Sequence, residues 1–202
     1  DLLRYMGIEA PDKELFIPLK AESEKWLAEL FKQEGINDTD KLLAIHPAAS
    51  CPSKIWPAER FAETADKLAQ NYGFKILVIA GPKDAEVAKN LINHMRSATI
   101  NLAGRTTVAQ LASLLKRCKL LISNDSGPVH IASAAGTPVI SIFARNQAGL
   151  SPKRWGPVGK KDKVLHKAVC IECLAHNCQK EFACLKAISV EDVLAAADTI
   201  LK

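Results

Sequence analysis

No apolar stretch of the sequence approaches the roughly 20 residues that a membrane-spanning helix needs, and no signal peptide is evident. No strand-like segment is followed by G-x-G-x-x-G, which disfavours an NAD-dependent dehydrogenase. Internal repeats and low-complexity segments are missing as well. The net charge of +5 is mild, so it permits an anionic partner without demanding nucleic acid, and we expect no nucleic-acid partner.

What is present is a chain of 202 residues, 48% hydrophobic, that can bury the core of one domain. It starts at Asp1 rather than at Met, so we expect it to be trimmed or part of a longer chain. Apolar runs alternate with segments of helical periodicity. Strands are expected at 42–46, 75–80, 99–102, 120–123 and 139–143, and helices at 22–34, 58–72, about 87–96, 108–118 and 128–135. The alternation predicts an α/β fold: a Rossmann-like parallel sheet with helices on both faces.

The stretch 120–143 organises the rest, because it reads as strand, tight turn, short helix and strand. Pro128 suits a first helical turn, and Ser126 or Asp125 can cap the free amides there. Gly127 lacks the Cβ that would keep a ligand off the backbone, and a helix N-terminus suits phosphate. Asp125 would accept hydrogen bonds from sugar hydroxyls. In the alternative interpretation, Asp125 and Ser126 form an Asx-type turn and only cap the helix.

A second loop, residues 46–57, joins the carboxyl end of a strand to a helix, which is where open α/β sheets bind ligands. Lys54 can neutralise a phosphate there, and Ser50 can donate a hydroxyl. The alternative is a solvated Lys54. Trp56 is expected to fill the core rather than to stack on a base.

Acidic residues follow the next strand, at Asp84 and Glu86. An acid just beyond a strand end can accept hydrogen bonds from a ribose diol. Acids in the first turn of a helix also complement its dipole, so both interpretations stay open.

After residue 143 the chain reads as a loop to 167, and its later part carries a cluster of cations, which are Lys153, Arg154, Lys160, Lys161, Lys163 and Lys167. Such clusters are usually solvated, although this one leaves a strand end of the expected site. We therefore keep open a role with an anionic substrate or a membrane surface.

The last part of the sequence contains four cysteines, Cys170, Cys173, Cys178 and Cys184. Their spacing, C-x2-C-x4-C-x5-C, could surround one zinc ion, but it lacks a second C-x2-C pair. The alternative is four reduced thiols or reversible disulfides. We expect no metal and keep these cysteines as weak candidates. Ser189, with Asp192 three residues later, is expected to open a last helix to Lys202.

Several motifs occur in an order that resembles glycosyltransferase family 9, the ADP-heptose:lipopolysaccharide heptosyltransferases. They are H-P-A-A-S-C-P-S-K-I-W-P, the acidic segment 80–86, N-D-S-G-P-V-H-I-A-S-A-A-G-T-P-V-I-S-I-F, R-W-G-P and the cysteine loop. The resemblance runs from about Leu42 to the end. It implies one half of a GT-B fold, with residues 41–202 as the nucleotide-sugar-binding domain and residues 1–40 as an interdomain connection and packing helix.

By this resemblance the donor site would comprise Ser50, Lys54, Asp84, Glu86, Asp125, Ser126, Gly127 and His130. Lys54 and Ser50 would contact the diphosphate, together with the amides of Ser126 and Gly127. Asp84 or Glu86 would bind the ribose, and Asp125 the heptose. Lys54 and Asp125 are the catalytic candidates. His130 lies in the motif, and a structural role is equally open to it.

The sequence departs from the family pattern at two places. Ala48 stands where Gly is usual, and Ala144-Arg145-Asn146 replaces Gly-Pro-Thr. The family's acceptor-binding domain, which holds the proposed general base, has no counterpart in these residues.

The resemblance implies an inverting transferase without a cofactor, whose substrates are an ADP-sugar donor and a lipid-linked oligosaccharide acceptor of the lipopolysaccharide inner core. We expect the isolated chain to be largely inactive without its N-terminal acceptor domain. Its expected place is the cytoplasm, with a peripheral contact with the inner membrane as a further expectation.

Three rival functions stay open. A GT-B-type sugar-nucleotide epimerase would need UDP specificity and its own acid and base. A non-catalytic nucleotide-binding module would show no preference for the sugar. A zinc-dependent interaction protein would use the cysteine loop.

Overall fold

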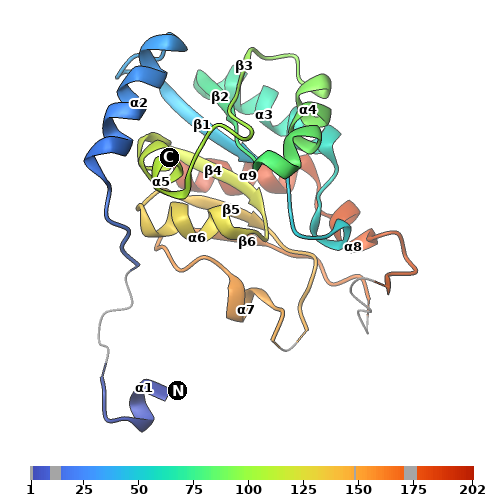
Figure 1. Ribbon diagram of the computed structural model, residues 1–202. Helices are drawn as coiled ribbons and strands as arrows, with labels where there is room; N and C mark the ends of the chain where they lie inside the picture. Colours follow the sequence, from blue (N-terminus) through green and yellow to red (C-terminus); the bar gives the residue numbers. More distant parts are fainter. Residues whose placement is uncertain (1, 10–14, 148, 171–176) are drawn as a thin grey trace.

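The computed structural model describes residues 2–9, 15–147, 149–170 and 177–202. In these residues six parallel strands form one sheet in the order β3-β2-β1-β4-β5-β6 (Figure 1). The strands are β1 (Lys41–His46), β2 (Phe74–Val78), β3 (Thr99–Asn101), β4 (Leu120–Asn124), β5 (Val139–Ile142) and β6 (Lys163–Leu165).

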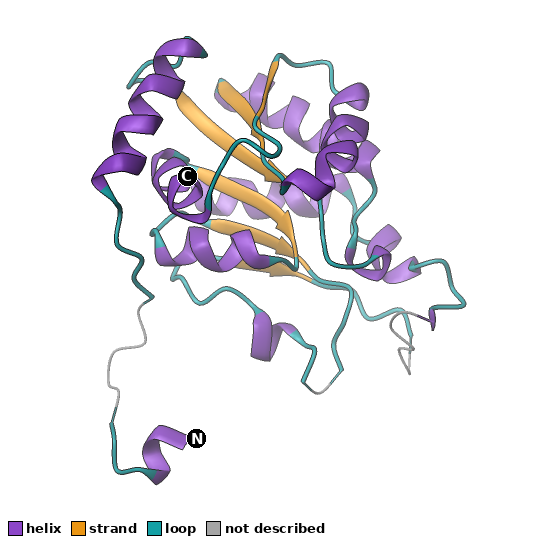
Figure 2. Cartoon of the chain, in the orientation of Figure 1, coloured by secondary structure: helices purple, strands orange, loops and turns teal. Residues whose placement is uncertain are grey.

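Helices cover both faces of this sheet (Figure 2). One face packs against α2 (Ala21–Gln33), α5 (Val108–Arg117) and α6 (Gly127–Ala134). The other packs against α3 (Ala58–Tyr72), α4 (Ala85–His94) and α9 (Val190–Leu201). The shorter elements are α1 (Leu2–Tyr5), η1 (Pro52–Lys54), η2 (Pro82–Asp84), α7 (Pro152–Trp155) and α8 (Ala183–Ala187).

Strand residues alternate between two apolar cores. In β1, Leu43 and Ile45 belong to the core under α3, whereas Leu42 and Ala44 belong to the core under α2 and α5. All four are fully buried, as expected for a parallel strand covered on both faces. The predicted Rossmann-like α/β fold is therefore confirmed.

Several helix ends lie where the sequence signals predicted them. Helix α3 ends at Gly73, whose φ of 70° is the left-handed conformation that glycine adopts without strain. Thr107 forms a capping box with Gln110 at the start of α5. Ser189 and Asp192 form another at the start of α9. These short-range signals are physically local, which is why sequence alone reveals them.

The expectation that residues 144–167 form a loop is wrong in part, because this segment contains α7 and β6. Strand β6 pairs in parallel with β5, with Val164 opposite Ser141. Its residues Lys163 and Val164 are exposed, so the strand lacks the buried apolar run by which the other strands were found. The pairing rests on backbone hydrogen bonds at the edge of the sheet.

Helix α2 packs on the six-stranded sheet, since its residues Leu27, Leu30 and Phe31 are buried in the apolar core on that face. The division into a connecting segment 1–40 and a domain 41–202 stays a prediction. Among the described helices, none is long and apolar enough to cross a bilayer.

Candidate functional site

The strand order places a switch point between β1 and β4. The chain fills one half of the sheet with β2 and β3, then crosses to the other half with β4, β5 and β6. At such a point the loops that leave the carboxyl ends of the two central strands diverge and open a crevice for a ligand. Two of the loops selected from the sequence, those after β1 and β4, leave these ends.

A pocket of about 420 Å³ opens there. We call it the carboxyl-edge pocket, and its lining residues are Ser50, Lys54, Asp125, Ser126, Gly127, His130, Arg145, Leu150 and Trp155. Six of the eight donor-site residues expected from the sequence therefore lie together, although their roles stay predictions.

Asp84 and Glu86 are the two that do not line this pocket. Asp84 is half-buried at the end of η2, and Glu86 is exposed in the first turn of α4, one strand further along the same edge of the sheet. Their position in a first turn matches a dipole contact, and the ribose contact stays a prediction.

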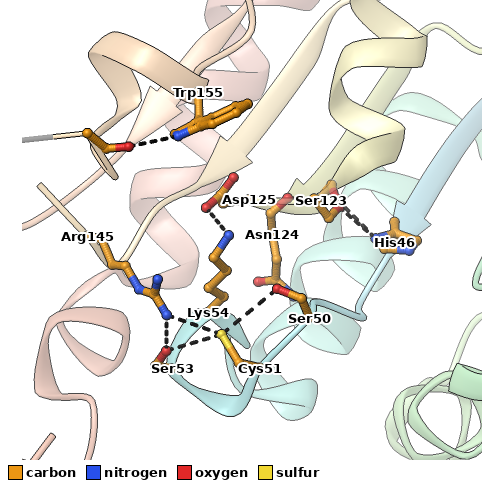
Figure 3. A network of polar contacts seen from close by, with 12 residues as sticks. His46, Ser50, Cys51, Ser53, Lys54, Ser123, Asn124, Asp125, Arg145 and Trp155 are labelled. Atoms are coloured by element: carbon orange, nitrogen blue, oxygen red, sulfur yellow. Dashed lines mark hydrogen bonds and ion pairs between the residues drawn. The ribbon is translucent and has the colours of Figure 1, made fainter. Parts of the chain in front are cut away.

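Lys54 and Asp125 form an ion pair in the pocket. The Lys54 Nζ lies 2.6 Å from the Asp125 Oδ2, and the two side chains are 20% and 11% exposed (Figure 3). The sequence had assigned them to different parts of a ligand. A phosphate that bound Lys54 would have to compete with the carboxylate of Asp125.

Asn124, which the sequence analysis did not select, holds the Lys54 loop at both ends. Its Oδ1 accepts a hydrogen bond from the backbone N–H of Trp56 at 3.0 Å, and its Nδ2 donates to the carbonyl of Pro47 at 2.6 Å. The amide is fully buried at the end of β4. Because a buried amide left unpaired is costly, this clamp fixes the loop on the sheet edge.

Trp56 fills the core, as expected. Its side chain is fully buried, with the ring edge-on to Phe61 at 4.9 Å between centroids. The indole Nε1 donates to the carbonyl of Ile188 at 3.0 Å. Trp56 therefore ties the loop to the C-terminal part of the chain and does not face the pocket.

The helix cap expected at Ser126 is not formed by its side chain. No hydrogen bond from its side chain caps α6. Its Oγ instead lies 3.1 Å from the His46 Nδ1 and 2.9 Å from the Ser123 Oγ. The expected caps are thus engaged elsewhere, Ser126 with His46 and Asp125 with Lys54, which leaves the first turn of α6 without a side-chain cap from Ser126.

His46 lies beneath this turn and was missed by the sequence analysis. It is 6% exposed, and burial lowers the pKa of the imidazole to about 4. The ring is therefore neutral near pH 7 and can exchange a hydrogen bond with Ser126 or Ser123. A histidine at the end of an apolar strand does not change the hydrophobic periodicity, so no sequence pattern indicates its contact with Ser126.

Gly127 lies at the start of α6, where the surrounding space would admit a side chain. A Cβ built on it would meet no atom within 4 Å, and its φ is not in the left-handed region. Neither packing nor backbone conformation therefore requires glycine. Space over the backbone at a helix N-terminus is what an incoming anion needs.

Trp155, at the end of α7, forms the outer rim. Its indole Nε1 donates to the carbonyl of Gly149 at 2.9 Å, and its ring remains 46% exposed. The Arg154 guanidinium lies 5.3 Å from the centroid of that ring. Figure 3 shows Trp155 across the pocket from the Lys54 loop.

A larger pocket, of about 610 Å³, lies at the opposite edge of the sheet. We call it the amino-edge pocket; it is lined by Leu15, Ser133, Gly136, Thr137, Pro138, Val158, Gly159, Lys160, Lys161 and Asp162. Asp162 accepts hydrogen bonds from Ser133 Oγ and from the backbone N–H groups of Val139 and Gly159. These hydrogen bonds use the Asp162 carboxylate to join β5 to the segment before β6. The carboxyl-edge pocket is therefore the better candidate for a ligand site.

The cysteines kept as weak candidates for zinc ligands fall partly outside the described residues. Cys173 lies in the range 171–176, which the structure does not describe. Among described residues, no group of three or more histidines, cysteines or acids is arranged to hold a metal ion. The zinc alternative stays an untested prediction.

Comparison with known proteins matches the chain to "Glycosyltransferase family 9 (heptosyltransferase)" over residues 2–183. The lipopolysaccharide core heptosyltransferase OpsX of Haemophilus influenzae is 28% identical over 88% of this chain and 47% of its own length. A crystal structure of a family 9 glycosyl transferase from Veillonella parvula is 30% identical, with a TM-score of 0.86 over 98% of this chain and 57% of that one. The E. coli heptosyltransferase WaaC with ADP has the same fold at 20% identity, with a TM-score of 0.68 over 98% of this chain and 53% of that one. The chain thus spans about half the length of these relatives.

Proposed function

The chain belongs to glycosyltransferase family 9, the heptosyltransferase family, and we propose that it supplies the donor-binding half of an enzyme of lipopolysaccharide core biosynthesis. The donor would be ADP-heptose and the acceptor a lipid-linked inner-core oligosaccharide. The activity belongs to the whole protein, because the matched relatives are about twice as long as the matched chain. The general base would come from an acceptor domain that these residues do not include.

The observation that carries this proposal is the Lys54–Asp125 ion pair beside the N-terminus of α6. A cation and a helix N-terminus together suit a phosphate, and a carboxylate suits sugar hydroxyls. All three lie at the switch point of a parallel sheet, where nucleotides bind in this fold class. One solved relative of the same fold carries ADP.

The ion pair suggests how donor binding would proceed. A diphosphate offers Lys54 more negative charge than one carboxylate does, so Lys54 turns from Asp125 to the phosphate. Asp125 then has free acceptor oxygens for the hydroxyls of the sugar. Exchange of one partner for another keeps both charged side chains satisfied before and after the donor binds.

Transfer itself would invert the anomeric centre. The acceptor hydroxyl oxygen forms a bond to the anomeric carbon, and the bond between that carbon and the phosphate oxygen breaks. The hydroxyl proton goes to the base of the acceptor domain. Lys54 and the first amides of α6 stabilise the charge that develops on the departing ADP. Asp125 holds the sugar in place.

The cations of segment 144–167 fit the remaining part of the proposal. Lys153 is exposed in α7, next to the pocket rim, whereas Lys160 and Lys161 are exposed at the amino-edge pocket. Exposed cations of this kind would attract anionic acceptor groups or the anionic face of a membrane. A cytoplasmic protein with a peripheral contact at the inner membrane would use them in this way.

Calorimetric titration of the chain with ADP-heptose, ADP and a UDP-sugar tests the proposal. We expect ADP-heptose to bind best and ADP next, while the UDP-sugar binds weakly. Preference for the UDP-sugar would favour an epimerase. Equal binding of ADP and ADP-heptose would favour a nucleotide-binding module without a sugar function.

A further inference from the structure

Trp155 is a large, exposed apolar side chain in the wall of the carboxyl-edge pocket. It lies at the end of α7, lines the pocket and is 46% exposed. Leu150 is the other large apolar residue of the lining, whereas the lining residues that follow β1 and β4 are polar apart from Gly127. Ligand pockets commonly combine an aromatic wall with a few polar groups that fix the orientation of the ligand. Trp155 is therefore a candidate for contact with an apolar part of a ligand.

The orientation of the indole is fixed by contacts within the chain. Its Nε1 donates to the Gly149 carbonyl at 2.9 Å, and the backbone N–H of Trp155 donates to the Ser151 carbonyl at 3.1 Å. The Arg154 guanidinium lies over the ring, 5.3 Å from its centroid. Indole has no polar atom besides Nε1, so a ligand can meet only its aromatic surface. A ring already held in place loses little conformational entropy when a ligand covers it.

Asp125 gives the pocket a second feature that suits a sugar. Figure 3 shows Asp125 between Trp155 and Lys54, and all three residues line the pocket. A sugar ring has two kinds of surface, hydroxyl groups at its edge and C–H groups on its faces. The carboxylate oxygens accept hydrogen bonds from hydroxyls, and the indole covers C–H groups that would otherwise face water. Together the two side chains match both surfaces of the ring.

The strand order indicates which end of a nucleotide sugar would reach Trp155. Asp84 and Glu86, the candidates for the ribose, follow β2, on one side of the switch point between β1 and β4. Trp155 follows β5, on the other side. The nucleoside and the sugar are attached to opposite ends of the diphosphate, so a diphosphate at the switch point sends them in opposite directions along the sheet edge. The sugar, not the adenine, would then lie against Trp155.

We propose that Trp155 is a specificity-determining residue of the donor site, on whose indole the apolar C–H face of the sugar packs while Asp125 accepts hydrogen bonds from the sugar hydroxyls. The proposal rests on the donor role proposed above for the same pocket. Lys54 and the N-terminus of α6 bind the diphosphate that ADP and ADP-heptose share, whereas Trp155 contacts only the sugar that distinguishes them. Loss of the ring therefore lowers the affinity for ADP-heptose and spares ADP.

Calorimetric titration with ADP and ADP-heptose tests the proposal in the unaltered chain and in three variants. Trp155→Leu removes the aromatic ring and keeps an apolar side chain, and we expect it to weaken ADP-heptose about 10-fold and ADP less than about 2-fold. Trp155→Phe keeps an aromatic face and loses the Nε1 hydrogen bond, and its affinity for ADP-heptose should stay within about 3-fold. Phe16→Leu is the matched control, because Phe16 is an aromatic residue 84% exposed and outside the pocket lining. It should bind both ligands as the unaltered chain does.

Tryptophan fluorescence gives a second readout, which reports on the ring itself. The sequence contains three tryptophans, and Trp56 is fully buried. Covering the exposed indole of Trp155 should shift the emission to shorter wavelength with ADP-heptose but not with ADP. The shift should be lost in Trp155→Phe, which still binds the ligand, and retained in Phe16→Leu. A merely structural role of Trp155 would produce no such ligand-specific shift.

The role of Trp155 is overturned if Trp155→Leu binds ADP-heptose normally. Equal weakening of ADP and ADP-heptose by that variant would also overturn it, because the ring would then serve the base or the fold. If Trp155→Phe binds ADP-heptose as weakly as Trp155→Leu does, the Nε1 hydrogen bond carries the effect and the proposal fails. An emission shift of equal size with ADP and ADP-heptose would contradict it as well.

The same titrations separate this proposal from the one on which it rests. If the unaltered chain binds ADP-heptose more tightly than ADP and Trp155→Leu keeps that difference, only the role of Trp155 fails. If the unaltered chain binds both ligands equally, or neither, the donor function proposed for the pocket fails, and the role of Trp155 is overturned with it.

Discussion

The amino-edge and carboxyl-edge pockets contain similar side chains and use them differently. Each is lined by hydroxyls, at least one lysine and one aspartate. In the amino-edge pocket, Asp162 accepts hydrogen bonds from two backbone amides and a buried serine. In the carboxyl-edge pocket, Asp125 is held by the flexible side chain of Lys54. A carboxylate bound to the backbone is part of the fold, whereas one held by a lysine can exchange that partner for a ligand.

The strongest test of this contrast is Asp162→Ala. It would leave the amides of Val139 and Gly159 without their acceptor, and buried donors without partners are costly. We expect a loss of about 2 to 4 kcal/mol in the free energy of unfolding, measured by urea denaturation, with the ADP affinity of the folded protein unchanged. Asp125→Ala is the matched control and should cost less, about 1 kcal/mol, because the flexible side chain of Lys54 can turn its ammonium group to water once the partner is gone. Similar losses of stability in both variants would erase the distinction.

The pH dependence of stability sharpens the comparison at the carboxyl edge. The pKa of His46 is lowered by burial to about 4, below the usual 6.5, so the unfolded chain binds the proton more tightly. The stabilisation by neutral His46 is therefore complete above about pH 6.5 and is lost as the pH falls towards 4. Between pH 7 and pH 5 we expect a loss of about 2 kcal/mol from this group.

His46→Asn provides the control for that measurement, because it keeps a polar atom near the position of Nδ1 and does not titrate. Urea denaturation at pH 7 and pH 5 should show a smaller difference for the variant than for the unaltered chain. Equal differences would mean that other groups carry the acid sensitivity. Asp192 and Asp198, whose carboxyl pKa values are lowered mainly by hydrogen bonds to Lys167 and Tyr72, would contribute at lower pH in both proteins.

A pair of glycine substitutions gives the smallest expected effects. Gly127→Ala places a methyl group where no protein atom lies, so the free energy of unfolding should stay within about 0.5 kcal/mol. Its ADP affinity should fall about 10-fold, because the methyl group occupies space over the helix N-terminus. Gly136→Ala, at the amino edge, has a φ of 77° and should lose about 1 kcal/mol of stability with ADP affinity unchanged. Normal ADP binding by Gly127→Ala would remove one argument for the site.

Sequence reasoning located the loops of the site because their signals are local. Apolar runs and the positions of Pro and Gly are enough to predict the strand-turn-helix pattern at 120–135 and the loop 46–57. Six residues predicted for the donor site line one pocket. The pairing of Lys54 with Asp125 was not predicted, since it depends on the order of the strands in the sheet rather than on spacing along the chain.

The missed residues share a physical reason. Asn124, His46 and Arg145 act through partners far away in sequence, such as the contact of Arg145 with Ser53. None of them disturbs the periodicity of its own segment. Arg145 was noted only as a departure from a family pattern, and nothing in the triplet Ala144-Arg145-Asn146 indicates that the guanidinium is buried. Strand β6 was missed because edge pairing does not require an apolar run.

The most direct test of the account is calorimetric titration of ADP and ADP-heptose into the unaltered chain, Lys54→Ala and Asp125→Ala. If the ion pair divides its partners between phosphate and sugar, Lys54→Ala weakens both ligands by about 10- to 100-fold. Asp125→Ala then weakens ADP-heptose about 10-fold and leaves ADP as tight or tighter, since it no longer competes for Lys54. Equal weakening of both ligands by Asp125→Ala would contradict the account, because the pair would then act as one structural unit.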